Sequence, residues 1–105
     1  MINTTSELGV AARMRPVIDR VAKAYGITRE QLLSGGTYEI IEAKSLCVWL
    51  AREIELPLSG DQLRSVLGYT SRSLVRQAMH RITERRRVDR TLLETSDRLV
   101  EELRA

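Results

Sequence analysis

The sequence of 105 residues predicts an all-α fold, a single helical bundle, on three observations. Apolar residues recur at the three- and four-residue spacing of amphipathic helices through most of the chain. No stretch alternates apolar and polar residues between turn dipeptides, as a half-buried strand would. Phenylalanine is absent and aromatic residues are only 4% of the chain, so the core must be mainly aliphatic, which suits packed helices.

The chain is expected to consist of an N-terminal arm over residues 1–15, partly helical or flexible, and a folded domain over residues 16–105. Pro16 predicts either a kink or a fresh helix start, because proline lacks the N–H that continues a helix. Arg13 and Arg15 in the arm could touch a phosphate, but a solvated arm is the favoured interpretation.

Two helices are predicted in the first third of the chain. A helical pattern starts at Glu7 and ends before Gly26. Thr28 and Gln31 then stand three residues apart, the spacing of a capping box, and predict a very short helix. Residues 34–36, Ser-Gly-Gly, break the chain and are expected to form a flexible connection rather than a nucleotide loop, since no Gly-Lys-Ser/Thr follows.

A long helix is predicted from about residue 39 to 55, with apolar residues at helical spacing, and it is expected to be the central core helix. Trp49 lies near the edge of its apolar stripe, and Pro57 ends it. Cys47 is the only cysteine, which excludes an internal disulfide, and its apolar neighbours predict burial. A last helix is expected over about 89–103, capped by its aspartate.

The stretch from residue 58 to 87 is the most informative part of the chain. It predicts a short helix, a tight turn and a longer helix. Ser59 and Gln62 have the spacing of a second capping box. Gly68 can end the short helix by adopting a left-handed conformation.

The longer helix, about residues 71–87 with Thr70 or Ser71 as its cap, has two chemically distinct faces on a helical wheel. The apolar face comprises Leu74, Val75, Ala78, Met79 and Ile82, and the polar face comprises Arg72, Ser73, Arg76, Gln77 and His80. Such a helix buries one side and offers hydrogen-bond donors on the other, which is the anatomy of a helix-turn-helix that reads DNA.

Positive charge is concentrated in the same region. Residues 72–90 hold seven arginines and two acidic residues, a net charge of +5, whereas the whole chain carries +3. A concentrated cationic patch favours a polyanion, and arginine forks suit phosphate and guanine. A basic helix can also be merely solvated, or lie on acidic lipid or a protein partner. A tight turn has no use on a membrane, so nucleic acid is favoured.

In the order of its elements the chain resembles, over about residues 16–103, the C-terminal DNA-binding domain of the bacterial replication initiator DnaA, which has a Trp-repressor-like fold. The matching stretches are VIDRVAKAYGITREQLLS (17–34), VWLAREIELPLSGDQLRSVLG (48–68) and the helix after Asp89. The resemblance implies a helical bundle with a helix-turn-helix and double-stranded DNA as its partner.

Departures from the family fall at the DNA-reading positions. The family signature Asp-His-Thr-Thr-Val is here Ser-Arg-Ser-Leu-Val over residues 71–75, so Arg72 replaces a base-contacting histidine. The family's arginine-rich loop that reaches the minor groove corresponds to residues 35–39, which carry no positive charge. The resemblance therefore implies a different sequence code, with Arg76 and the arginine cluster 81–90 as candidates to offset the lost loop contacts.

The leading hypothesis is a sequence-specific DNA-binding transcription regulator, cytoplasmic and nucleoid-associated. Without the ATPase module of DnaA, a free-standing domain resembles small bacterial or phage regulators, including activators of gene transfer agents. It would bind double-stranded DNA as a monomer or a homodimer, with Arg72 paired to guanine. The candidate DNA-binding residues are Ser59, Tyr69, Thr70, Ser71, Arg72, Ser73, Arg76, Gln77, His80 and Arg81.

The alternative hypothesis is a protein-interaction module on a degenerate DNA-binding scaffold, which recruits RNA polymerase or another transcription or replication factor. The absence of positive charge in residues 35–39 favours it slightly. Catalysis, a metal and a cofactor are not expected, because one histidine and one cysteine on different helices form neither a triad nor a metal set. No membrane partner is expected, since no apolar run approaches the length of a membrane span.

Overall fold

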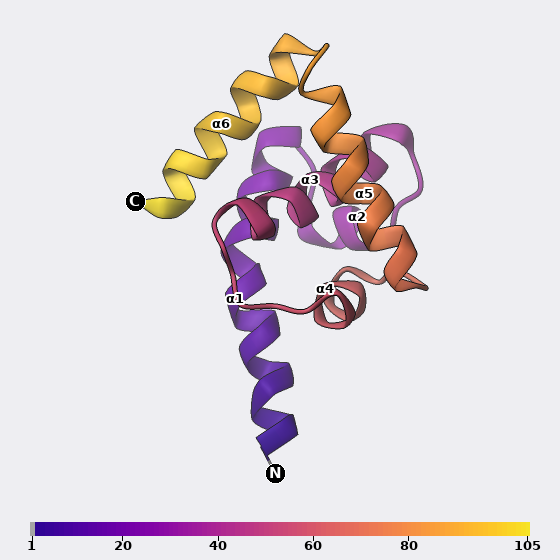
Figure 1. The fold of residues 1–105 in the computed structure, drawn as a ribbon, viewed down its shortest axis with the longest axis vertical. Coiled ribbons are helices and arrows are strands. Elements are labelled where there is room, and N and C mark those ends of the chain that lie inside the picture. Colours follow the sequence, from indigo (N-terminus) through magenta and orange to yellow (C-terminus); the bar gives the residue numbers. More distant parts are fainter. Residues whose placement is uncertain (1) are drawn as a thin grey trace.

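The computed structural model describes residues 2–105, with side chains from Gly9 onward, and every regular element in that range is an α-helix (Figure 1). The helices are α1 (Ile2–Tyr25), α2 (Arg29–Ser34), α3 (Tyr38–Glu53), α4 (Gly60–Leu67), α5 (Arg72–Arg85) and α6 (Arg90–Arg104). The predicted all-α class is therefore confirmed.

Side-chain caps determine where the short helices begin. Oγ1 of Thr28 accepts the Gln31 backbone N–H, and Oγ of Ser59 accepts that of Gln62, at 3.0 and 3.1 Å. In return, the side-chain oxygen of each glutamine accepts the backbone N–H of its capping residue, both at 2.8 Å. Both predicted capping boxes are thus confirmed, and they fix the first turns of α2 and α4.

The helices α5 and α6 are each capped by a single side chain, without the reciprocal bond of a capping box. Ser71, one of the two predicted candidates, accepts the Leu74 N–H at 3.4 Å at the start of α5. Asp89 accepts the Leu92 N–H at 3.0 Å at the start of α6, as expected. The hydroxyl and carboxylate satisfy N–H groups that have no partner within the helix.

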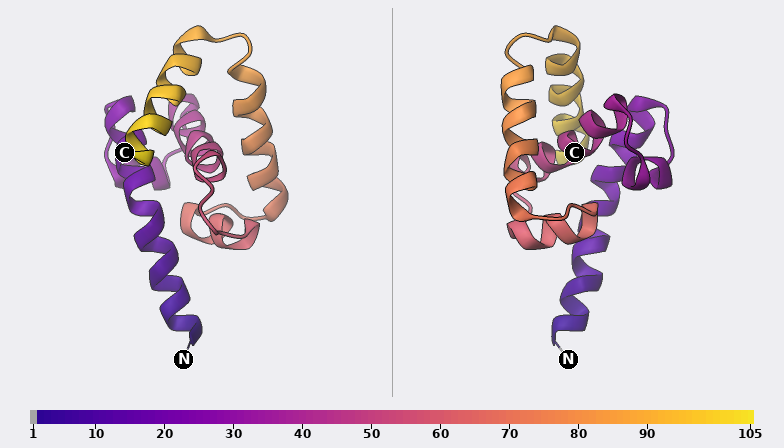
Figure 2. Two further views of the ribbon diagram at one scale, coloured as in Figure 1. Left: turned by 60° about the vertical axis from the view of Figure 1, so that its left-hand side comes forward. Right: turned by 90° about the vertical axis from the view of Figure 1, so that its right-hand side faces the viewer.

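The helix α3 forms the centre of the bundle, between α1 on one side and α5 on the other (Figure 2). Its predicted apolar stripe is buried except at Ile54, which is half-buried just beyond the helix. Trp49 is buried rather than marginal, with 6% of its surface exposed. Cys47 is fully buried, as expected, and burial raises the pKa of its thiol.

The helix α1 differs most from expectation. It is one continuous helix through Pro16, so it neither begins afresh at the proline nor starts as late as Glu7. Pro16 is exposed, as is Ala12, whose carbonyl the proline cannot bond, so this carbonyl is near solvent. Buried Met14 and Val17 hold the same stretch in the core, while the N-terminal half of α1 extends away from the bundle (Figure 1).

The connection between α4 and α5 is short and depends on Gly68. This residue has φ +77° and ends α4 in the left-handed conformation, as predicted. Its N–H and that of Tyr69 bond back to carbonyls of Ser65 and Arg64 in the last turn of α4. The turn therefore sets the angle at which α5 leaves α4.

We expect Gly68→Ala to lower the free energy of unfolding by about 1–2 kcal/mol, because an L-residue is strained at this φ. A Cβ there would meet only the Leu33 carbonyl, at 3.9 Å, so the cost is one of backbone conformation. Gly36→Ala is the matched control, since a Cβ meets nothing within 4 Å and no positive φ is required. Urea unfolding measures the stability of both variants, and equal midpoints for Gly68→Ala and Gly36→Ala would contradict this role of Gly68.

Candidate nucleic-acid interface

The polar face of α5 is open to solvent. The residues Arg72, Ser73, Arg76, Gln77 and His80 are all exposed. On the opposite side Val75, Ala78 and Ile82 are buried against the core. Met79 is only half-buried and Leu74 is 36% exposed, so the apolar face is narrower than predicted. The helix thus presents a broad row of donors and acceptors.

An open groove of about 350 Å³ lies where α4 and α5 begin and α3 ends. Arg52, Arg72 and Arg76 line it, and no carboxylate is among its described lining residues. The lining is completed by Gly60, Val48, Val75 and Met79. Three guanidinium groups around one groove, beside the N-terminal ends of two helices, make a region that attracts anions.

The three arginines of the groove are held to different degrees. Nη1 of Arg52 donates to the Leu58 carbonyl at 2.8 Å, which anchors that side chain beside the groove. Nε of Arg72 lies 3.7 Å from a carboxylate oxygen of Asp61, and the Arg72 side chain is 69% exposed. Arg76 has no ion pair with any residue of the described chain. Sequence reasoning missed Arg52, whose only signal was a cation in the last turn of a helix.

The candidate residues around the turn are partly occupied by structural bonds. Ser59 and Ser71 cap their helices, and Oγ of Ser71 also shares a hydrogen bond with Oγ of Ser73 at 3.0 Å. Thr70 is exposed. Tyr69 is half-buried with Nζ of Lys44 5.5 Å from its ring centre, and burial raises the pKa of Tyr69 to about 12. The hydroxyl groups of Ser59 and Ser71 are thus already engaged in the fold, and the Tyr69 phenol is uncharged at neutral pH.

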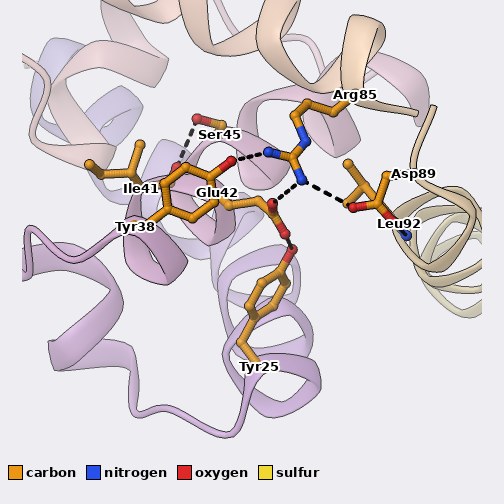
Figure 3. A network of polar contacts seen from close by, with 8 residues as sticks. All are labelled: Tyr25, Tyr38, Ile41, Glu42, Ser45, Arg85, Asp89 and Leu92. Carbon is orange, nitrogen blue, oxygen red and sulfur yellow. Dashed lines mark hydrogen bonds and ion pairs between the residues drawn. The ribbon is translucent and has the colours of Figure 1, made fainter. Parts of the chain in front are cut away.

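At the C-terminal end of α5, the partly exposed side chain of Arg85 joins four helical segments (Figure 3). Its Nη2 lies 3.1 Å from Asp89 and 3.6 Å from Glu42, and its Nη1 donates to the Tyr38 hydroxyl. The Tyr25 hydroxyl donates to Glu42 at 2.6 Å. One guanidinium thereby links α5 to α3, to the cap of α6 and, through Glu42, to α1.

Three ionisable groups of this network have shifted pKa values. The hydrogen bond to Asp89 raises the pKa of the Arg85 guanidinium. The Leu92 N–H, followed by the Arg85 guanidinium, holds the pKa of Asp89 below its ordinary value. Burial, followed by the hydrogen bond to Glu42, raises the pKa of the Tyr25 phenol. At neutral pH Asp89 is ionised and Tyr25 is a neutral donor, which are the forms this network requires.

Arg86 also packs against the fold, and only 20% of its side chain is exposed. Its guanidinium lies 4.3 Å from the centre of the Trp49 ring, 2.9 Å from Asp97, and donates to the Ser96 hydroxyl. Arg81 donates to the Ser45 hydroxyl at 2.8 Å. Arg85 and Arg86, together with the hydrogen bond of the exposed Arg81, therefore help to hold α5 in place.

The remaining arginines of this cluster are solvated. Arg87 and Arg90 have side chains 72% and 88% exposed. Each pairs only loosely with a glutamate nearby in the sequence, Glu84 and Glu94. Exposed pairs of this kind contribute little to stability. The exposed members of the cluster are Arg81, Arg87 and Arg90, and their predicted role in offsetting the lost loop contacts stays a prediction.

Comparison of the chain with protein-family models, with curated proteins and with solved structures gives no match. Between residues 2 and 105 no helix has the length and apolar character needed to cross a membrane. Over the same residues no three His, Cys, Asp or Glu side chains gather in a way that could hold a metal ion.

We expect Arg86→Ala to lower the free energy of unfolding by about 1–3 kcal/mol, through loss of the stacking on Trp49 and of the contacts to α6. The neighbouring Arg87→Ala removes the same charge from a solvated position and should change it by less than about 0.5 kcal/mol. Urea unfolding followed by Trp49 fluorescence checks both. Similar losses for the two variants would contradict the assigned packing role.

Stability should also depend on the Asp89 carboxylate. Because folding lowers the pKa of Asp89, its contribution is present at pH 7 and is lost as the pH falls through the lowered value. Asp89→Asn keeps a good helix cap but removes the charge. We expect the variant to be less stable than the wild type at pH 7, and the difference in urea midpoints to shrink as the pH falls below 3.8. A difference that stays constant as the pH falls would contradict this.

Proposed function

We propose that this protein is a sequence-specific, double-stranded DNA-binding transcription regulator. In this proposal α4, the turn at residues 68–71 and α5 act as a helix-turn-helix, with α5 as the recognition helix. The observation that carries it is the groove lined by Arg52, Arg72 and Arg76, which continues into the exposed polar face of α5. Affinity for DNA comes largely from neutralised phosphates, and specificity from donors that reach base edges.

The N-terminal end of α5 would enter the major groove. Arg72 is then nearest to bases, and its fork can pair with O6 and N7 of guanine. Gln77 and His80 lie further along the same exposed face. Arg52 and Arg76 would meet backbone phosphates, together with the free N–H groups in the first turn of α4.

A fold like that of the DnaA DNA-binding domain is part of the same proposal. It is supported by the order of elements: a short helix with a capping box, a long central helix, the α4–α5 pair and a terminal helix. The segment between α2 and α3 lacks positive charge, so minor-groove contacts of the family type are not proposed here. The proposed operator therefore differs from an origin box.

A second candidate function is supported by exposed apolar side chains at the start of α3. Tyr38 and Ile41 are 64% and 42% exposed. An apolar site beside a DNA-binding helix fits an activator that also contacts RNA polymerase or another factor. Binding of this kind would resist salt, whereas DNA binding would weaken steeply with it.

DNA binding can be tested by sequencing the genomic fragments that the purified protein retains at near-physiological salt. We expect a defined motif, and its symmetry would report whether one copy or two bind. Arg72→Ala should lose about 1–3 kcal/mol of discrimination at one base pair. Arg76→Ala should weaken all duplexes alike and reduce the salt slope by about 1.

Arg98→Ala is the matched control, because this arginine is 58% exposed on α6 and does not line the groove. It should leave the motif unchanged. Thermal unfolding of each variant confirms that the fold is retained. Absence of any duplex binding at low ionic strength would overturn the proposal, as would an unchanged motif in Arg72→Ala.

A further inference from the structure

An acidic residue stands beside the groove although the region around it is cationic. Asp61 is the second residue of α4, and its side chain is 62% exposed. One of its carboxylate oxygens lies 3.5 Å from Nε of Arg64 and 3.7 Å from Nε of Arg72. A carboxylate at this position would face the phosphates that the proposed interface binds, and like charges repel there.

The stem of Arg72 lies beside Gly60, where a Cβ would be 3.7 Å from Cδ of Arg72 and 4.0 Å from its Cγ. Asp61 approaches the guanidinium at Nε. The two terminal nitrogens, which form the fork that pairs with guanine, make no hydrogen bond within the described chain and are available to a ligand.

We propose that Asp61 is a positioning and specificity-determining residue that acts through Arg72. This inference rests on the proposed DNA-binding function. Asp61 orients the Arg72 fork toward a base edge. It also partly neutralises the guanidinium charge, so that Arg72 contributes less binding free energy to a phosphate contact. Binding to sequence-independent DNA, which depends on phosphates, is thereby weakened relative to binding at the preferred site.

A purely structural role for Asp61 is the alternative. A carboxylate in the first turn of a helix is favoured by the helix dipole, and Asp61 is so placed in α4. Such a role would alter stability and would leave the preference between two DNA sequences unchanged. The ratio of two affinities therefore separates the two roles.

The test is Asp61→Asn, which keeps the shape of the side chain and removes its charge. Affinities are measured for a duplex carrying the motif retained from genomic DNA and for a scrambled duplex of equal composition, at one salt concentration. We expect tighter binding to the scrambled duplex and a specificity ratio reduced by about fivefold or more. In an Arg72→Ala background the same substitution should leave the ratio unchanged, because Asp61 acts through that arginine.

Glu101→Gln is the matched control, an exposed carboxylate on α6 with no ion pair in the described chain, and its ratio should equal that of the wild type. An unchanged ratio in Asp61→Asn, or an equal fall with and without Arg72, overturns the inference and leaves the proposed function standing. Equal affinity of the wild type for both duplexes overturns sequence-specific binding itself, and the inference with it.

Discussion

The packing of α5 against α3 is the constraint on which the rest of the structure depends. The start of α3 lies beside the end of α5, where Tyr38 meets Arg85, and the two helices run in opposite directions. Burial of Val75, Ala78 and Ile82 on this interface forces the opposite side of α5 outward. The polar row is therefore exposed as a consequence of core packing, and the groove forms where the two helices and α4 meet.

Arginines fall into two groups along α5. In its second half, Arg81 bonds to Ser45 and Arg85 to Glu42, both on α3, and Arg86 just beyond it bonds to Asp97 on α6. These polar contacts hold a helix end that has few apolar residues. The arginines in the first half of α5 have few partners. The charge of Arg85 and Arg86 is thus balanced within the fold, and the exposed charge lies on Arg72 and Arg76 in the first half of α5 and on Arg87 and Arg90 beyond its end.

Local chemistry was predictable from the sequence, whereas long-range pairing was not. Capping boxes, the left-handed Gly68 and the two faces of α5 depend on residues close in the chain. The capping boxes and Gly68 were confirmed, and the faces of α5 were confirmed except at the exposed Leu74 and the half-buried Met79. The bonds of Arg85 and Arg86 join residues from different helices, which no periodicity encodes. Gly35 was expected merely to loosen a connection, but a Cβ there would collide with Ile40, so its lack of a side chain permits close packing.

The proposed interface was predictable only in part for the same reason. The sequence placed Arg72 and Arg76 on one helical face, but the groove needs Arg52 from α3 and the missing side chain of Gly60. The arginines of the groove also differ in how much conformational entropy each side chain would lose when the groove binds an anion. Immobilising a free side chain of this length costs about 0.5–1.5 kcal/mol. Arg52, bonded to the Leu58 carbonyl, is partly ordered in advance, whereas Arg76 is not. The groove is thus lined by one anchored cation, Arg52, and by two, Arg72 and Arg76, that make no hydrogen bond within the described chain, so the entropic cost of binding an anion there would fall mainly on the latter two.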